Sequence, residues 1–347
     1  MKISVLGAGA IGSMLGGLIR YHDPAVELVL ISRGAHGQAM RERGKLTLQG
    51  PWEDRTVDVT ATDDMAAIAG SDHVLVTVKS QGTEQAIAAA APFLGGAIVT
   101  SVQNGFSDNV LLQHVDPARL VMGITATNVT IPSPGTASLQ FPGTLVVGPR
   151  PDGANRSAAG DVADVLGKTG FQVYQNDQIE GVRYNKLCIN SPGYAASLSQ
   201  TNFIADGVCN TPWRRAVGLP LVQECLDVFD AAGIPLVSIP KLPDIQKLRK
   251  FFRLLDNPIA GPVVRVGAKA IYNRRPIQFS LEQDLRRGNG TEVDYTIGEI
   301  VRVARAAGVD APRNQLIIDL AKEIESRGAG QFMTRQEVVD RFAAIDR

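Results

Sequence analysis

The chain has 347 residues, of which 44% are hydrophobic and 20% are charged, and its formal net charge is zero. This length favours two domains, each with its own core, and the composition is typical of an ordinary globular protein. A neutral chain gives no sign of a nucleic-acid surface, and its longest apolar stretches, such as 86–94, are far shorter than the roughly 20 residues of a membrane span.

The first residues predict a strand, a glycine turn and a helix. The apolar run 2–6 (KISVL) leads into the sequence GAGAIG at 7–12, which opens a helical apolar pattern. In such a turn the first glycine permits the tight bend, the second lets backbone amides approach a pyrophosphate, and the third allows close helix packing. The helix start adds an anion site. We therefore expect a dinucleotide at this turn, with contacts from Gly7, Gly9, Ala10, Ile11 and Gly12.

The end of the second predicted strand, 27–31, indicates which dinucleotide is bound. A site that prefers NAD has an acidic residue there, about 20 residues after the glycine turn, which binds the adenosine ribose. This chain has Ser32 and Arg33 instead. A guanidinium pairs well with a 2′-phosphate and a hydroxyl can add a hydrogen bond, so we expect NADP(H). The alternative is that Arg33 is an ordinary solvated loop arginine.

Strands and helices alternate from residue 1 to about residue 178. Continuous apolar strands between helices predict a doubly wound parallel sheet, that is, an α/β Rossmann-type domain over 1–178. The dipeptide Pro142-Gly143 predicts a hairpin between strands 137–141 and 144–147. Further strands are expected at 72–78, 97–102, 120–126 and 171–174, and helices at 83–94, 109–115 and 155–167.

Helical periodicity replaces the strand pattern after residue 178, which predicts an all-α C-terminal domain over 179–347. Segment 258–275 is less periodic and is expected to interrupt the helices. The expected helices are 178–190, 214–232, 243–255, 283–308 and 313–327. A cleft between two domains is a common ligand site, so we expect a ligand there.

Two polar residues follow predicted strands of the first domain. Lys79 comes directly after the strand 72–78, and Asn104 follows the strand 97–102. Ligands of open α/β sheets lie at the carboxyl ends of the strands, so both residues should face the cofactor. Lys79 could contact phosphate or ribose, and Asn104 could hold the nicotinamide ribose or a substrate carbonyl. The alternative for each is a loop residue that precedes the next helix.

In the helical half, Lys186 and Asn190 are four residues apart and therefore share one helix face. An amine whose pKa shifts on burial can serve as a proton donor to a carbonyl substrate. Spacing alone also fits a solvated lysine. The stretch from Ser280 to Asp294 contains Glu292, and helix capping by Asn289 or Thr291 would explain its acids without catalysis.

Taken in order, these motifs resemble the ketopantoate reductase (2-dehydropantoate 2-reductase) family. The resemblance covers most of the chain: GAGAIG at 7–12, the arginine after strand two, VTVK ending at Lys79, QNG at 103–105, K-L-x-x-N at 186–190, S-x-x-x-D from Ser280, and T-E-x-D-Y at 291–295. It implies a Rossmann domain, a helical domain and NADPH in the cleft between them. The implied reaction is hydride transfer to the keto carbon of ketopantoate.

The resemblance also implies roles for individual residues. Lys186 would be the general acid that protonates the developing alkoxide, which is an interaction stronger in the transition state than in the ground state. Asn104 and Asn190 would position the substrate, Ser280 would bind its carboxylate, and Glu292 would orient the ligand or the cofactor ribose.

Three departures from the family pattern affect the substrate site. Tyr194 stands where the family usually has a second substrate-binding asparagine, so we place it in the substrate pocket. Pro192 precedes it and is expected to kink or end the helix. An insertion at 241–275 carries several basic residues, which would be either a solvated helix face or a lid for another 2-keto acid.

Three functions remain open at this point. The first is NADPH-dependent reduction of a 2-keto acid, ketopantoate by preference. The second is a related dehydrogenase of a bulkier or opine-like acid, and the third is a non-catalytic NADP(H) sensor, which would have no need for Lys186. We expect no nucleic-acid or membrane partner, and a homodimer is an alternative to the monomer. Three cysteines without a C-x-x-C pair indicate reduced thiols, and no cleavable leader precedes the first strand, so we expect a cytoplasmic protein without a metal.

Overall fold

A computed structural model describes the chain except for residues 152, 240–243, 275–276, 278 and 347. Contacts between Cα atoms divide the chain into two compact units, Met1–Glu180 and Gly181–Arg347. The first unit contains sheets and helices, and every regular element described in the second is helical. The expected order of an α/β domain and an all-α domain is thus confirmed. No helix among the described residues is long and apolar enough to cross a membrane.

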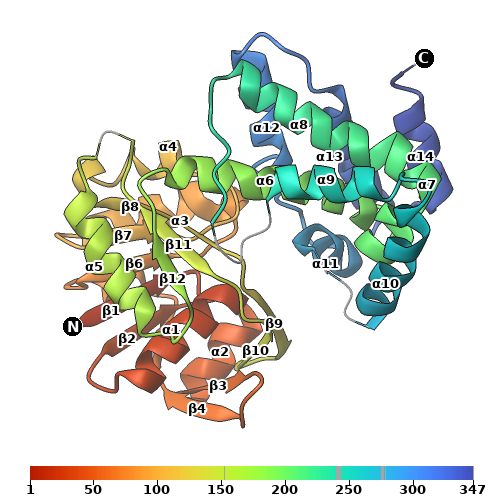
Figure 1. Ribbon diagram of the computed structural model, residues 1–347. Coiled ribbons are helices and arrows are strands. Elements are labelled where there is room, and N and C mark those ends of the chain that lie inside the picture. Colours follow the sequence, from red (N-terminus) through yellow and green to blue (C-terminus); the bar gives the residue numbers. More distant parts are fainter. Residues whose placement is uncertain (152, 240–243, 275–276, 278, 347) are drawn as a thin grey trace. The chain divides into compact units, whose positions relative to one another are not determined.

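The first unit is built on an eight-stranded sheet in the order β12-β11-β8-β7-β6-β1-β2-β5 (Figure 1). All neighbouring strands pair in parallel except β11 and β8. The strands are β1 (Lys2–Leu6), β2 (Glu27–Ile31), β5 (Thr60–Thr62), β6 (His73–Val76), β7 (Ile98–Ser101), β8 (Leu120–Thr125), β11 (Leu145–Gly148) and β12 (Val173–Gln175). From β1 the chain builds outward first to β2 and β5 and then, in the other direction, from β6 to β8. The topological switch point therefore lies between β1 and β6, where open α/β sheets bind ligands.

Alternate residues of these strands face two separate apolar clusters, so both faces of the sheet are buried. One cluster joins Ile3, Val5, Leu28 and Leu30 to α1 (Ala10–His22) and α5 (Arg156–Gly167). The other joins Val29, Ile31, Val74 and Val76 to α3 (Thr83–Ala90) and α4 (Asp108–Leu111). This double cover is why the strands are continuously apolar. The remaining helix of the unit, α2 (Gly34–Arg43), follows β2.

A second sheet of four strands, in the order β4-β3-β10-β9, corrects the predicted hairpin. Its strands are β3 (Lys45–Gln49), β4 (Arg55–Asp58), β9 (Asn128–Ser133) and β10 (Thr136–Phe141). Strand β10 pairs with β9 and β3, whereas β11 lies in the large sheet, so Pro142-Gly143 joins two sheets. The prediction failed because Pro142 fixes φ near −65°, and two-residue hairpin turns need positive φ at their first central residue.

The second unit contains α6 (Ile179–Ser197, begun in the first), α7 (Thr211–Trp213), α8 (Leu219–Ala231), α9 (Ile245–Leu254), α10 (Ala260–Arg274), α11 (Ser280–Arg287), α12 (Ile297–Ala306), α13 (Pro312–Arg327) and α14 (Arg335–Ala343). Two π-helical turns, Phe203–Val208 and Arg214–Gly218, follow α6 and α7.

Two expectations about these helices are wrong. Helix α6 continues through Pro192 to Ser197, so the expected helix end there is wrong, whereas the kink stays a prediction. Segment 258–275 does not interrupt the helices, because most of it forms α10. Its weak periodicity has a physical cause, since α10 buries only Gly261 and Ala268, which carry little or no side chain to mark a core face. Pro243 of the predicted helix 243–255, and both ends of the insertion, Lys241 and Arg275, lie outside the described residues.

Candidate active site

The glycine turn after β1 has the geometry that the sequence predicts for Gly7 and Gly12. Gly7 has φ +91°, and a Cβ there would lie 2.3 Å from the side chain of Val78. A Cβ on Gly12 would lie 2.3 Å from Thr77 Oγ1 and 2.7 Å from Val5, which confirms that this glycine lets α1 pack against the sheet. A Cβ on Gly9 would meet nothing nearer than 3.9 Å, so the backbone at Gly9 is open to a ligand.

The amides of the first turn of α1 complete this anion site. Because α1 begins at Ala10, the N–H groups of Ala10, Ile11 and Gly12 have no acceptor within the helix. A helix start of this kind favours phosphate groups, both through its free amides and through its dipole. The residues present therefore fit the pyrophosphate of a dinucleotide.

A hydrogen-bond network that the sequence did not reveal lies behind the turn. The carbonyl oxygen of Ala8 accepts from the hydroxyls of Ser13 and Ser32, each at 3.1 Å. His36 Nε2 lies 3.0 Å from Ser13 Oγ, and the N–H of Gly135 donates to His36 Nδ1 at 3.1 Å. Since Nδ1 accepts, the ring is neutral with its proton on Nε2, and burial lowers the pKa of His36. The network fixes the turn from β1 to α1 in place.

The end of β2 presents Arg33 to solvent and turns Ser32 inward. Arg33 is exposed at the N-cap of α2. The Ser32 proton is directed to Ala8, so donation by Ser32 to a 2′-phosphate stays a prediction. Arg41 of α2 donates to the Ser32 carbonyl at 3.0 Å and lies 3.8 Å from Asp63, which stabilises this loop. No acidic side chain occupies the two positions that follow β2.

Lys79 and Asn104 lie in the loops that follow two paired strands. Val76 at the end of β6 is in register with Ser101 at the end of β7, and each candidate comes three residues later. The side-chain amide of Gln103 donates to the Val78 carbonyl at 2.8 Å and to Thr83 Oγ1 at 2.6 Å. Gln103 therefore ties the two loops together, a role that its place in the QNG motif did not reveal.

In the helical unit, α6 carries Lys186, Asn190 and Tyr194 at intervals of four residues. Because α6 continues past Pro192, all three share one helix face. An unbroken helix is what places Tyr194 on the same side as the candidate acid. A helix that ended at Pro192, one of the two outcomes expected from the sequence, would have separated them.

The surroundings of Lys186 shift the pKa of its amine. The residue keeps some exposed surface, but its amine is enclosed, and burial lowers the pKa of Lys186 to about 8. The negative charge of Glu292 acts in the opposite direction and raises the pKa. A pKa near the working pH is the condition under which an amine both holds a proton and releases it readily.

Tyr194, two turns further along α6 than Lys186, forms a hydrogen-bonded pair with Ser280 of α11. Their hydroxyl oxygens lie 3.0 Å apart, and Tyr194 is 2% exposed. Burial, with smaller contributions from the negative charges of Glu292 and Asp284, raises the pKa of Tyr194 to about 12. The phenol therefore stays neutral. The ring meets Phe279 edge-on, with centroids 6.1 Å apart.

Glu292 lies in the turn before α12, and its expected place in a helix after a cap at Asn289 or Thr291 is wrong. The cap of α12 is Thr296, whose hydroxyl donates to the Glu292 carbonyl at 2.9 Å. The amide of Thr291 is used elsewhere, since it donates to Glu325 at 2.8 Å. The negative charge of Glu292 raises the pKa of both Lys186 and Tyr194, so its carboxylate is within electrostatic range of both side chains.

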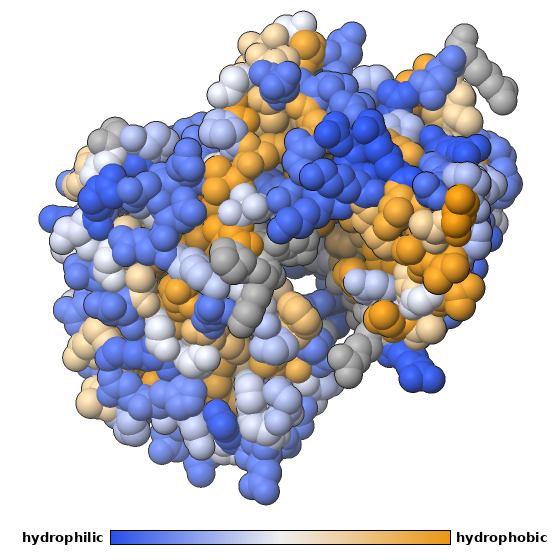
Figure 2. All heavy atoms as spheres, in the orientation of Figure 1, coloured by the Kyte–Doolittle hydropathy of each residue, from blue (hydrophilic) through white to orange (hydrophobic). Residues whose placement is uncertain are grey.

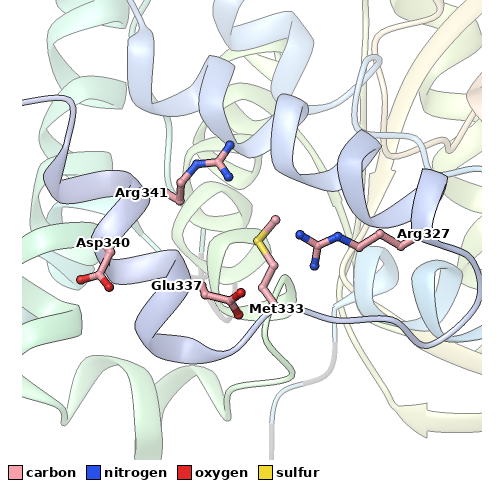
Figure 3. Close-up of a pocket in the computed structure, with 5 residues that line it drawn as sticks. All are labelled: Arg327, Met333, Glu337, Asp340 and Arg341. Atoms are coloured by element: carbon pink, nitrogen blue, oxygen red, sulfur yellow. The ribbon is translucent and has the colours of Figure 1, made fainter.

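The candidate residues thus fall into two groups. Gly7 to Gly12, Ser32, Arg33, Lys79 and Asn104 belong to the first unit, and Lys186, Asn190, Tyr194, Ser280 and Glu292 belong to the second. Figure 3 shows a cavity of about 160 Å³ elsewhere on the second unit, at α13 and α14. None of its five lining residues is a candidate, and two of them, Arg327 and Arg341, are both paired with Glu323.

The chain has a glycine turn that fits a dinucleotide, at the switch point of a parallel sheet. It also has a buried amine with a lowered pKa. These two features together define a class of protein. That class is the dinucleotide-dependent oxidoreductases, in which a cofactor supplies reducing equivalents and a side chain supplies the proton. The comparisons with known proteins then give the family.

The family model described as ketopantoate reductase PanE/ApbA matches residues 3–152, and its C-terminal counterpart matches residues 178–325. The chain belongs to the ketopantoate reductase family, a family of oxidoreductases that act on CH–OH groups with a nicotinamide cofactor. The 2-dehydropantoate 2-reductase of Pyrococcus horikoshii is 27% identical over 332 residues, which cover 95% of this chain and 99% of the relative. That of Pyrococcus abyssi is 28% identical, with 94% and 98% covered.

Solved structures agree with this assignment. A PanE/ApbA family ketopantoate reductase from Ralstonia eutropha JMP134 is similar with a TM-score of 0.74 and 27% identity, covering 94% of this chain and 99% of that one. A D-mandelate dehydrogenase solved with NADH and anilino(oxo)acetate has a TM-score of 0.76 at 21% identity, with 94% and 99% covered. At that identity the likeness concerns the fold.

Proposed function

We propose that this protein reduces 2-dehydropantoate (ketopantoate) to pantoate with NADPH, and that Lys186 is the general acid. The observation that carries the proposal is the enclosed Lys186 amine, whose pKa is lowered to about 8 and which lies within the electrostatic reach of Glu292. Membership of the ketopantoate reductase family and the names of its curated relatives support the substrate.

In this proposal a bound reduced nicotinamide supplies the hydride to the keto carbon. The residues of the chain supply the proton and orient the substrate. The ammonium of Lys186 donates a proton to the keto oxygen as negative charge develops there, and Glu292 keeps that amine protonated near neutral pH. Asn104 and Asn190 orient the substrate, and Ser280 donates to its carboxylate.

The pairing of Tyr194 with Ser280 gives that last role a physical basis. Tyr194 is fully buried and its phenol is neutral, so its proton can be given to Ser280 Oγ. The Ser280 proton is then left to donate to the anionic ligand, and the two hydrogen bonds strengthen each other. Tyr194 therefore acts as a positioning residue for Ser280.

The proposal of NADPH over NADH rests on Arg33. Arg33 is exposed at the start of α2, directly after β2, and no acidic residue stands there to hydrogen-bond a ribose 2′-hydroxyl. An exposed guanidinium at this point suits a 2′-phosphate.

The test is to follow the oxidation of NADPH with ketopantoate and with a series of branched and aromatic 2-keto acids. We expect turnover at ordinary enzyme rates with ketopantoate. NADPH binding without oxidation in the presence of any of these acids would instead support the cofactor sensor.

A second candidate is a bulkier 2-keto acid, and the aromatic pair Tyr194 and Phe279 favours it. A ring at position 194 replaces the smaller asparagine that is usual in the family, and Phe279 is the residue directly before Ser280. Turnover restricted to a larger acid would select this candidate. The Tyr194→Phe variant should then keep its preference for that acid, while Tyr194→Asn should shift the preference toward ketopantoate.

A further inference from the structure

Gly193 lies inside α6, one residue before Tyr194, and makes a close contact with Phe279. A Cβ at Gly193 would lie 2.1 Å from Cζ of the Phe279 ring and 2.3 Å from its Cε1. Glycine in the interior of a helix is destabilising relative to alanine, so its presence there indicates a place where another group comes close. The ring of Phe279 thus lies directly against the backbone of α6.

This contact is on the face of α6 that carries the candidate residues. Gly193 comes three residues after Asn190 and seven after Lys186, which is the spacing of one helix face. The Phe279 ring therefore covers that face about one turn beyond Asn190. Phe279 is also the N-cap of α11, and Ser280 is the first residue of that helix. The contact between the ring and α6 thus determines where α11 begins.

The ring of Phe279 is confined by two other aromatic rings. Tyr194 meets it edge-on with a centroid distance of 6.1 Å, and Phe203 meets it edge-on at 5.5 Å. A methyl group on Gly193 could not push the ring aside without disturbing these contacts. We therefore expect such a methyl group to displace the backbone of Phe279, and Ser280 with it.

Phe203 is itself fixed in the core of the helical unit. It is 3% exposed, and its ring packs against Trp213 and Phe252 with centroid distances of 6.2 and 6.3 Å. Asn202, directly before it, donates to the carbonyl of Tyr272 in α10 at 2.9 Å. Figure 2 shows the apolar outer side chains of α10 on the right of the view, and the turn that begins at Phe203 packs against that helix.

The hydrogen bond between Ser280 and Tyr194 depends on the position of α11. Their hydroxyl oxygens are 3.0 Å apart, and Ser280 belongs to α11 whereas Tyr194 belongs to α6. The distance therefore changes whenever the start of α11 moves relative to α6. A movement of about 1 Å is enough to break a hydrogen bond between two hydroxyl groups.

We propose that Gly193 and Phe279 are positioning residues, which together hold Ser280 where its hydroxyl pairs with Tyr194 and donates to the carboxylate of the 2-keto acid. This inference rests on the proposed function, since it takes Ser280 as the residue that binds the carboxylate. It extends that function, because it assigns part of the affinity for the acid to two residues without a polar side chain.

The experiment compares Gly193→Ala, Phe279→Leu and the double variant Gly193→Ala/Phe279→Leu, with the 2-keto acid that the unmodified protein reduces. Gly193→Ala should raise the KM for the acid by about tenfold, as expected when a hydrogen bond to a charged group is weakened. It should leave kcat almost unchanged, since uniform binding is lost and not the proton donor. The double variant should recover most of the KM, because leucine lacks the ring atoms that the methyl group meets.

A second comparison separates positioning from a general loss of structure. In a chain that already carries Ser280→Ala, the further change Gly193→Ala should leave the KM where it is, because no hydroxyl remains to be misplaced. Gly160→Ala is the matched control, since it adds a methyl group to a glycine of α5 with no atom within 4 Å of the new Cβ. It should not change the KM.

Urea unfolding tests the steric contact without any substrate. Gly193→Ala should lower the urea midpoint of the otherwise unmodified chain, and lower it much less in the Phe279→Leu background. Equal effects in the two backgrounds would overturn the contact. An unchanged KM in Gly193→Ala, or a further tenfold rise when Gly193→Ala is added to Ser280→Ala, would overturn the positioning role while ketopantoate reduction by the unmodified protein still stands. Failure of the unmodified protein to reduce any 2-keto acid would instead overturn the proposed function, and the role of Ser280 with it.

Discussion

The two units present their candidate ligand contacts in different ways. In the first unit the contacts come mainly from backbone amides, and the glycines at 7, 9 and 12 make the approach of a ligand and the packing of α1 sterically feasible. In the helical unit the contacts come from side chains on one face of α6 and from Ser280 and Glu292. Backbone recognition fixes a common group such as a pyrophosphate, whereas side chains on a helix can change the substrate without changing the fold. The predictions below test this division, beginning with the largest expected effect.

Removal of the amine of Lys186 should slow ketopantoate reduction strongly and leave NADPH binding by the first unit intact. We expect Lys186→Ala to lower kcat by about 10²–10⁴-fold, the usual contribution of a general acid. Fluorescence titration should give an unchanged dissociation constant for NADPH. Lys45→Ala, at an exposed lysine of β3, is the matched control and should keep its kcat. Near-normal turnover of Lys186→Ala would remove the proposed acid.

The glycine turn should respond differently at two of its glycines. Gly12→Ala forces a Cβ to within 2.3 Å of Thr77 Oγ1, and overpacking of this kind costs about 1–3 kcal/mol of the free energy of unfolding. Gly9→Ala has room in the folded chain, so it should change stability by less than about 0.5 kcal/mol. It should still weaken NADPH binding about tenfold or more, because the methyl group stands where the pyrophosphate approaches.

Urea unfolding and NADPH titration of both glycine variants separate the two effects. The roles assigned to the turn would be wrong if Gly9→Ala bound NADPH as tightly as the unmodified protein.

Arg33→Ala should raise the KM for NADPH by about 10–100-fold, as expected for the loss of a hydrogen bond between charged groups. The KM for NADH should stay unchanged, because NADH has no 2′-phosphate. Arg43→Ala, at the other end of α2, provides a control on an arginine that is also exposed. Equal use of NADH and NADPH by the unmodified protein would contradict the assignment.

The smallest expected effect is a shift in the pH profile of kcat. Lys186 with a pKa of about 8 is protonated below that pH, so kcat should fall as the pH rises through about 8. The charge of Glu292 raises this pKa, so Glu292→Gln should move the alkaline limb to lower pH, by about one unit or less. Rates at saturating ketopantoate and NADPH measure the shift. A limb that stays in place would assign the ionisation to another group.

The sequence predicted those features that depend on short-range steric rules. One example is the glycine turn between the first strand and the first helix, within residues 2–22. The sequence predicted glycine where a Cβ would clash, and the structure agrees at Gly7 and Gly12. The covered parallel sheet follows from continuous apolar strands. The four-stranded sheet was missed although Leu46, Leu48 and Val57 alternate with polar residues, which is a strand pattern that could have been recognised.

The features that could not be predicted depend on contacts between residues far apart in the chain. The pairing of Tyr194 with Ser280 spans 86 residues, and the contact of Gly135 with His36 spans 99. The pKa of Lys186 depends on burial and on Glu292, neither of which spacing reveals. Pro192 misled the prediction because a local rule about helix ends was overruled by the packing of a long buried helix.

The two serine hydroxyls that donate to the Ala8 carbonyl affect how well the glycine turn binds an anion. A backbone oxygen carries partial negative charge, and one facing the ligand would repel phosphates. Ser13 and Ser32 occupy the lone pairs of this oxygen from behind, and neutral His36 sustains that arrangement. The preference of the turn for an anion thus depends partly on hydroxyl and imidazole groups that act through the Ala8 carbonyl and not through contact with the pyrophosphate.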